Sequence, residues 1–244
     1  MIRSYIQYII IVIGFILGCL LIANAYRYKF QSTETISVTG LAETDFISDQ
    51  IVWKGVFTRY GVDLKQSYQA LKSDEAEIRK YLQTRGVPDS NFVFSSVNVE
   101  KNYETNYDDN GRIRGTIFRG YILTGIVTVD SKNINLVEQV SREVTELLQK
   151  GIEFNSNRPN YYYSKLNELK IDLLAKASQD ARQRAESIAK NSGVGIGKLK
   201  KATMGVFQIT GKNNNEEYSY GGSFNTSSKQ KTASITLRVE YLAN

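Results

Sequence analysis

Residues able to do acid–base or nucleophilic chemistry are sparse in this sequence. Histidine is absent from all 244 residues, and the single cysteine, Cys19, lies inside an N-terminal apolar run. The usual base at neutral pH, the commonest zinc ligand and any Ser-His or Cys-His pair are therefore missing. A hydrolase would have to use Asp, Glu, Ser, Lys or Tyr in a buried cluster with shifted pKa values. We assign no catalytic residue, metal ligand or cofactor site, and we expect the chain not to be an enzyme.

Two short motifs resemble ligand-binding loops, but their surroundings favour turns. Residues 108–110 (Asp-Asp-Asn) offer the oxygens that calcium prefers, yet Arg119 stands where an EF-hand loop would end in glutamate. The Asn-Gly pair at 110–111 instead predicts a hairpin turn. The glycines of 193–197 follow a predicted helix rather than opening one, so a helix cap and turn are predicted there instead of a phosphate loop.

A run of three tyrosines is a candidate contact surface. Tyr161, Tyr162 and Tyr163 lie in a predicted strand, so Tyr161 and Tyr163 point to one face and Tyr162 to the other. Tyrosine combines a large rigid ring with a polar hydroxyl and is enriched in protein interfaces. We treat the run as a possible subunit interface. Stacking on a ligand and plain packing in the core are the alternatives.

The charge pattern argues against a nucleic-acid partner. The formal net charge is +6 and the pI is about 9.2, but Lys and Arg alternate with Asp and Glu along nearly every segment. Such mixing is typical of a solvated surface rather than of a basic binding patch. The small-molecule ligand, if there is one, cannot be identified from these residues.

The N-terminus carries a segment suited to a membrane. Residues 8–25 (YIIIVIGFILGCLLIANA) form an uncharged, mostly apolar run, near the lower limit of the roughly 17–25 residues that cross a hydrocarbon core. We predict a single transmembrane helix over 8–25 in contact with membrane lipid, a cytoplasmic N-terminus at 1–7, and a polar tether at 26–34. A long polar domain after such a segment is usually exported, so residues 35–244 are expected outside the cytoplasm.

Two other fates of this segment stay open. Ala23-Asn24-Ala25 has the small-x-small form of a signal peptidase site, which would remove the segment after Ala25. The residues before Cys19 loosely resemble a lipobox, which would make Cys19 a lipidation site. Gly14 and Gly18 are four residues apart and would let two retained helices approach closely in lipid, although chance glycines in an apolar run are an equal alternative.

The periodicity of the remaining chain predicts an α+β body. Period-2 patterns alternate with amphipathic stretches, and the order of elements is ββαββαβαββ. This arrangement favours a mixed or antiparallel sheet with helices packed on it. The alanines on the inner face of the longest helix predict a close approach to its neighbour. The residues predicted on this face are Leu166, Leu169, Leu173, Ala177, Ala181, Ala185 and Ile188. The predicted strands are 35–39, 46–60, 92–103, 116–130, 152–163, 199–210 and 231–242, and the predicted helices lie between Asp63 and Gly86, Ser131 and Gly151, and Ser164 and Asn191.

Three segments together resemble the SIMPL domain family. They are Ile36–Gly40 (ISVTG), Ala177–Gly197 (ASQDARQRAESIAKNSGVGIG) and Ile235–Val239 (ITLRV), and the resemblance covers nearly all of 33–243. It implies a bacterial envelope protein with an N-terminal signal or anchor, similar to periplasmic immunogenic and oxidative-stress-defence proteins. It further implies an α+β body that can assemble into large ring-like or channel-like homo-oligomers. The chain departs from the family pattern at Ser48, where members often have proline.

These observations lead to one main hypothesis and one alternative. The first is a single-pass protein of the bacterial inner membrane whose periplasmic SIMPL-like domain forms homo-oligomers, with a structural or stress-related role and no catalysis. The alternative is an extracytoplasmic binding module for a small envelope ligand or a polysaccharide, with tyrosines as the contact surface.

Overall fold

The computed structural model describes residues 2–31, 34–213 and 219–244, and it confirms the α+β class with an apolar N-terminal helix. The helices are α1 (Ile2–Gln31), α2 (Leu64–Thr84), α3 (Ile134–Glu143) and α4 (Leu166–Ser192), with 3-10 turns at Asp89–Asn91 and Val144–Lys150. The strands are β1 (Thr35–Ile47), β2 (Gln50–Gly61), β3 (Phe92–Phe94), β4 (Asn98–Tyr107), β5 (Ile113–Ser131), β6 (Glu153–Ser156), β7 (Asn160–Tyr162), β8 (Ile196–Met204), β9 (Gln208–Gly211), β10 (Ser223–Phe224) and β11 (Gln230–Ala243).

The structure contains more strands than the sequence predicts, and several of them are shorter. The strands predicted at 92–103, 152–163 and 199–210 are each divided in two, and β10 lies inside a stretch predicted to be loop. Residues 214–218 of that predicted loop lie outside the described residues. Helix α1 continues to Gln31, so most of the predicted tether at 26–34 is helical, and residues 32–33 lie outside the described residues.

The chain forms two compact units, which we name by their main helices. The α4 unit contains residues 1–44, 169–207 and 234–244, and the α2 unit contains residues 45–168 and 208–233. Strands β1 and β11 run from one unit into the other, and they belong to a sheet with the order β1-β11-β9-β10, in which β8 also pairs with β11.

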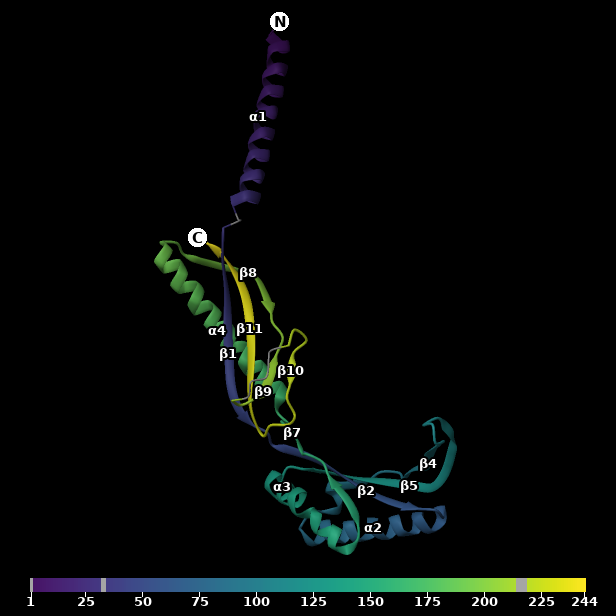
Figure 1. The fold of residues 1–244 in the computed structure, drawn as a ribbon. Helices are drawn as coiled ribbons and strands as arrows, with labels where there is room; N and C mark the ends of the chain where they lie inside the picture. Colours follow the sequence, from purple (N-terminus) through teal and green to yellow (C-terminus); the bar gives the residue numbers. More distant parts are fainter. Residues whose placement is uncertain (1, 32–33, 214–218) are drawn as a thin grey trace. The chain divides into compact units, whose positions relative to one another are not determined.

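The α2 unit is built on a six-stranded sheet covered by helices. Strands β2 and β5 pair antiparallel from Ile51↔Ser131 to Gly61↔Tyr121, and β3, β4, β6 and β7 extend this pair. Helices α2 and α3 lie along one face of the sheet (Figure 1). Side chains from the helices and from alternate strand positions form the apolar core between these layers. Its most buried members include Ile51, Trp53, Phe57, Leu71, Ile78, Leu82, Leu123, Val127, Val137 and Val140.

Local signals in the sequence explain where these helices begin and end. The Asp63 side chain accepts a hydrogen bond from the Gln66 N–H at 2.7 Å and caps α2. Asn133 caps α3 in the same way through Leu136. Gly151 has φ of 72° after the 3-10 turn, a left-handed conformation that favours glycine.

The α4 unit depends on a close approach between a helix and a strand. Leu173 and the alanines at 177, 181, 185 and 189 form the buried stripe of α4. A Cβ at Gly40 of β1 would lie 2.2 Å from the Ala177 carbonyl oxygen, so only glycine fits there. This confirms the close approach predicted from the alanines. The prediction that Ile188 faces inward is wrong, because the stripe repeats every four residues and buries Ala189 instead, leaving Ile188 46% exposed.

Candidate interaction surfaces

Helix α1 exposes an apolar surface over Val12–Lys29. The stretch Val12–Lys29 has a mean hydropathy of 1.3 and none of it is buried within the protein. At 1.5 Å per residue, eighteen residues measure about 27 Å, close to the thickness of a hydrocarbon core. The helix is therefore long and apolar enough to cross a membrane. A signal sequence passes the same test, so retention, cleavage after Ala25 and lipidation of Cys19 all stay as predictions.

The two glycines of α1 lie on an open helix surface. A Cβ added at Gly14 or Gly18 would meet nothing within 4 Å, and Cys19 beside them is exposed. The four-residue spacing puts both glycines on one face, where a second helix could approach closely. Packing of two helices through this face stays a prediction.

Tyr161 is held inside the α2 unit. Its hydroxyl donates a hydrogen bond to Glu138 Oε1 at 2.9 Å, and its ring packs against the apolar core. Burial, together with the hydrogen bond to the Glu138 carboxylate, raises the pKa of Tyr161 to about 12. The side chain of Tyr161 is therefore a neutral hydrogen-bond donor within the fold.

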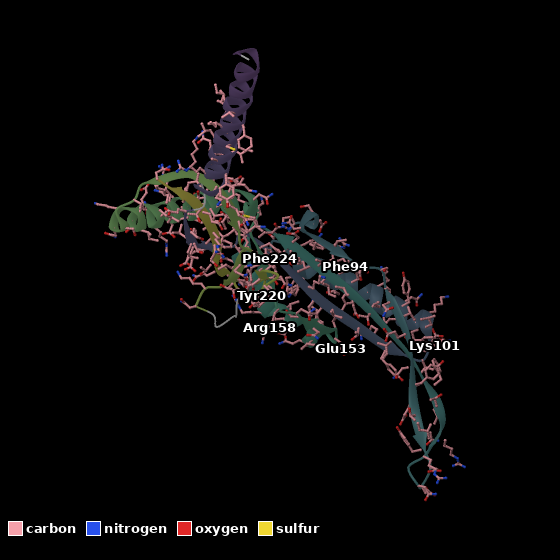
Figure 2. The ribbon with its side chains drawn as sticks, turned by 90° about the horizontal axis from the view of Figure 1, so that it is seen from above. Phe94, Lys101, Glu153, Arg158, Tyr220 and Phe224 are labelled. Atoms are coloured by element: carbon pink, nitrogen blue, oxygen red, sulfur yellow. The ribbon has the colours of Figure 1, made fainter. Side chains whose placement is uncertain are left out.

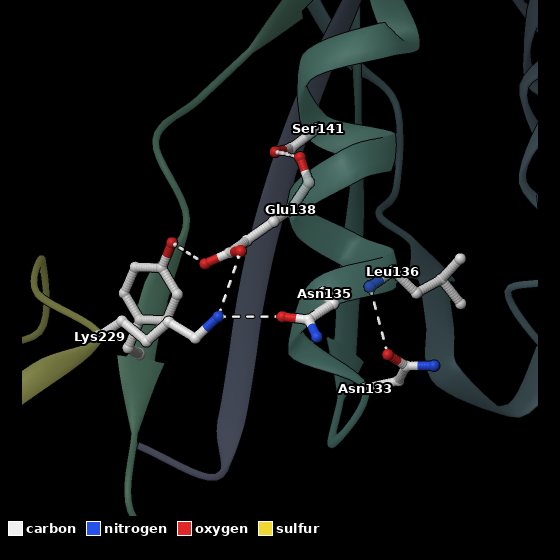
Figure 3. Close-up of polar contacts among 7 residues, drawn as sticks. Asn133, Asn135, Leu136, Glu138, Ser141 and Lys229 are labelled. Atoms are coloured by element: carbon white, nitrogen blue, oxygen red, sulfur yellow. Dashed lines mark hydrogen bonds and ion pairs between the residues drawn. The ribbon is translucent and has the colours of Figure 1, made fainter. Parts of the chain in front are cut away.

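Glu138 is the centre of a polar cluster between α3 and the segment that enters β11. Lys229 Nζ lies 3.3 Å from Glu138 Oε2 and 3.0 Å from Asn135 Oδ1. Figure 3 shows the Lys229 side chain extending toward Asn135 and Glu138 on α3. The Glu138 carboxylate thus accepts from the hydroxyl of Tyr161 and pairs with the ammonium of Lys229. We call Asn135, Glu138, Tyr161 and Lys229 the Glu138 cluster; it links β7 and the residue before β11 to α3.

The other two tyrosines of the run also make contacts, near the end of β1 and the start of β2. The Tyr162 carbonyl accepts a hydrogen bond from the Asp49 N–H at 3.0 Å. The ring of Tyr163 lies 4.9 Å from that of Phe46. All three tyrosines are only partly exposed. The structure thus places the predicted interface residues together, with each of them already in contact inside the α2 unit.

Two features of the same region could not be seen in the sequence. Lys231 is 2% exposed, and its ammonium donates to the carbonyl oxygens of Tyr161 and Asn225, each at 2.6 Å. Ser48 donates its backbone N–H to the Lys229 carbonyl oxygen at 3.0 Å. Proline has no N–H, so this bond requires a residue other than proline at position 48.

The two loops that resembled ligand sites are turns, as predicted. Asp108 Oδ1 accepts hydrogen bonds from the N–H groups of Asn110 and Arg112, and Gly111 has φ of 75°. Gly193 has φ of 73° at the end of α4, where the Val194 N–H donates to the Ala189 carbonyl oxygen. Within the described ranges, no three His, Cys, Asp or Glu side chains form a group that could hold a metal ion.

Strands β4 and β5 extend beyond the rest of their sheet as a two-stranded ribbon. β2 pairs with β5 only from Tyr121 onward, whereas β4 continues the pairing from Asn102↔Gly120 to Tyr107↔Ile113. Figure 2 shows this ribbon running outward past Lys101. We call residues 102–120 the arm. Among the described strands, none pairs with the outer edge of β4, and only β4 pairs with residues 113–120 of β5.

The two faces of the arm differ in character. Side chains opposite each other in an antiparallel pair share a face, and alternate residues of a strand do so too. Tyr103 pairs with Phe118 and Tyr107 with Ile113 on one face. The ring centroids of Tyr103 and Phe118 are 5.7 Å apart, and those of Phe118 and Tyr121 are 5.1 Å apart. The exposed apolar side chains of this face, which we call the apolar face of the arm, are Val99 at its base, Tyr103, Tyr107, Ile113 and Phe118.

The apolar face continues the core side of the sheet. Tyr121 packs against the core cluster and Leu123, two residues further along β5, is fully buried in it. Beyond Tyr121 the side chains become exposed: Tyr103 is 51%, Tyr107 58% and Ile113 70% exposed. The opposite face is more polar, with the ion pair of Glu104 and Arg119 between its strands. The arm thus has one face of core-like composition that is open to solvent.

Comparison with known proteins agrees with the sequence resemblance. The model of the SIMPL family, described as a protein of unknown function (DUF541), matches residues 36–241. A search of curated proteins finds no match. The match covers both compact units and begins just after the helix α1.

Proposed function

The chain belongs to the SIMPL family, and from this premise we propose that it is a single-pass protein of the bacterial inner membrane whose SIMPL domain lies in the periplasm and self-associates. Its role is structural or stress-related, including defence against oxidative stress, and no catalytic activity is expected. The observation that carries the proposal is α1, an apolar helix with no part of Val12–Lys29 buried, placed directly before the family domain.

Membrane insertion gives the exposed surface of α1 a favourable environment. Transfer of apolar surface out of water contributes about 25 cal/mol per Å², and several α1 side chains are more than half exposed, among them Phe15, Leu21 and Ile22. Anchoring would also confine the SIMPL domains to two dimensions. A weak contact between domains is then favoured by effective concentration.

The first experiment measures assembly. The full-length chain, extracted in detergent, is compared at equal concentration with a variant lacking residues 1–31, by light scattering coupled to size exclusion. Intact mass spectrometry of the same samples reports cleavage or lipidation. We expect a discrete oligomer of the full-length chain and a smaller species of the truncated one. Equal masses for the two would contradict the role of the anchor, and a chain beginning near Tyr26 would contradict retention of the helix.

A second experiment measures placement. Protease added to spheroplasts should digest the SIMPL domain while a cytoplasmic marker stays intact. Protection of the domain until the cells are lysed would contradict a periplasmic location.

The alternative function is a binding module for a small envelope ligand or a polysaccharide. It is favoured by exposed rings that could stack on a sugar, such as Tyr103 and Tyr107 on the arm and Tyr220, which is fully exposed. Saturable binding of a soluble polysaccharide by a form that no longer assembles would support this alternative over the first proposal.

A further inference from the structure

The arm raises the question of what covers its apolar face. A two-stranded ribbon alone is marginally stable in water, and stability usually requires a third strand or a packed face. The apolar face carries five large side chains that are between 40% and 70% exposed. Apolar surface concentrated on a protruding element marks an interaction site.

We propose that the apolar face of the arm docks against the same face of a second copy of this chain. This inference rests on the proposed self-association and names the surface that carries it. Each of the five side chains would bury roughly 100 Å², about half the area of a large side chain, so each copy would bury roughly 500 Å². Two copies together would bury about 1,000 Å² of apolar area, which reaches the lower limit for a specific interface.

The charges of the arm favour a copy of the same chain over a strongly charged partner. Between residues 102 and 120 there are three acidic residues and three basic residues, so the arm has no net charge, although the whole chain carries +6. An anionic lipid surface would be repelled by Asp108 and Asp109 at the tip. Two identical arms meet without a net repulsion. The acidic members are Glu104, Asp108 and Asp109, and the basic members are Arg112, Arg114 and Arg119.

The details of the strands favour docking through the face rather than through the edges. The β4–β5 ladder shifts register at Asn102/Tyr103 and again at Asn106/Tyr107. Such irregularities, and charged side chains along an edge, are devices that prevent a free strand from pairing with another chain. The exposed side chains that define the apolar face are all uncharged, and Lys101, which pairs with Tyr121, lies at the base of the arm.

Neighbouring residues of β4 provide a matched test. Thr105 lies on the apolar face and Asn106 on the opposite face, because side chains alternate along a strand. Each is changed separately, Thr105→Cys and Asn106→Cys, in a Cys19→Ser background so that the introduced thiol is the only one. A short bismaleimide is then added to the full-length chain in native membranes. Stacked sheets lie about 10 Å apart, so we expect a cross-linked dimer from Thr105→Cys at least about tenfold more abundant than from Asn106→Cys. Equal yields from the two, or a higher yield from Asn106→Cys, would overturn the proposal.

A second pair of variants measures assembly directly. Tyr103→Ser with Phe118→Ser should raise the concentration needed for assembly about tenfold or more, whereas Ile171→Ser, at a 71% exposed position on α4, should leave it unchanged. If the unmodified chain assembles but the arm variants assemble equally well, the docking surface lies elsewhere and the proposed function stands. If the unmodified chain is a monomer at every concentration, both the proposed self-association and the docking of the arm are refuted. A soluble polysaccharide that binds the arm and blocks cross-linking at Thr105→Cys would identify the arm as a ligand surface and overturn the docking of a second copy.

Discussion

Removal of one hydroxyl group, Tyr161→Phe, tests the Glu138 cluster. The ring stays packed against the core, but the hydrogen bond of 2.9 Å to Glu138 is lost. A hydrogen bond to a charged group contributes about 1.5–3 kcal/mol. The difference between an ordinary tyrosine pKa of 10.0 and the folded value of about 12 corresponds to about 2.7 kcal/mol by linkage. Because the site is only partly buried, solvent screening reduces the expected cost to about 1–2 kcal/mol.

The pH dependence of this cost has a definite sign. Below pH 10 the Tyr161 hydroxyl is protonated in both states, so the full stabilisation is present. Between pH 10 and about 12 the unfolded chain loses the proton while the folded chain keeps it, so the stabilisation declines as pH rises. The free-energy difference between the natural chain and Tyr161→Phe should therefore be largest at pH 8 and should shrink steadily above pH 10.

Urea unfolding measures this difference. The single tryptophan, Trp53, is fully buried in the same unit and reports unfolding by fluorescence. Tyr220→Phe is the matched control, since Tyr220 is fully exposed, and it should change stability by less than about 0.5 kcal/mol. A cost for Tyr161→Phe that is the same at pH 8 and pH 11 would refute the raised pKa of Tyr161 in the folded chain.

Three further substitutions test packing and polar contacts in the two units by thermal unfolding. Gly40→Ala should destabilise the α4 unit by about 1–3 kcal/mol through overpacking against α4. Gly221→Ala should be tolerated, because among the described atoms its added Cβ would meet only Ser219 Oγ, at 3.9 Å. Asp74→Asn should lower the free energy of unfolding by about 2–4 kcal/mol, because Asp74 is 4% exposed and pairs with Arg59 through two hydrogen bonds. An unchanged midpoint of thermal unfolding would show that this ion pair does not stabilise the fold. Ser48→Ala should raise stability by about 1 kcal/mol, since its buried hydroxyl has no hydrogen-bond partner among the described residues; a lower midpoint of thermal unfolding would show that the hydroxyl is hydrogen-bonded.

Local signals in the sequence predict the parts of this fold that depend on neighbouring residues. The caps of α2 and α3 follow from Asp63 and Asn133, and the antiparallel pairing of β4 with β5 follows from the Asn-Gly pair. The alanine stripe of α4 also predicts its close approach to a neighbouring element. In each case a few adjacent residues determine backbone conformation or the face of a helix.

Contacts between distant residues could not be predicted in the same way. Lys229 and Glu138 are 91 residues apart, and no periodicity links them. The tyrosine run shows that three large rings lie close together in the sequence, but not that the Tyr161 hydroxyl forms a hydrogen bond with Glu138 on α3. The length of the arm depends on where β2 stops pairing with β5, a property of three strands together. Lys231 looks like an ordinary exposed lysine in the sequence, and only the fold shows its buried position.

The size of the apolar face fits a protein that assembles only after anchoring. An apolar contact of roughly 500 Å² per copy is at the weak end of specific interfaces, and a dissociation constant near 1 mM corresponds to only about −4 kcal/mol. Free domains at low concentration would then stay separate. Anchors that hold the domains at an effective concentration in the millimolar range would make the same contact sufficient. The dependence of assembly on both α1 and the arm is therefore the expected signature: removal of either should disperse the oligomer, and each variant should still fold.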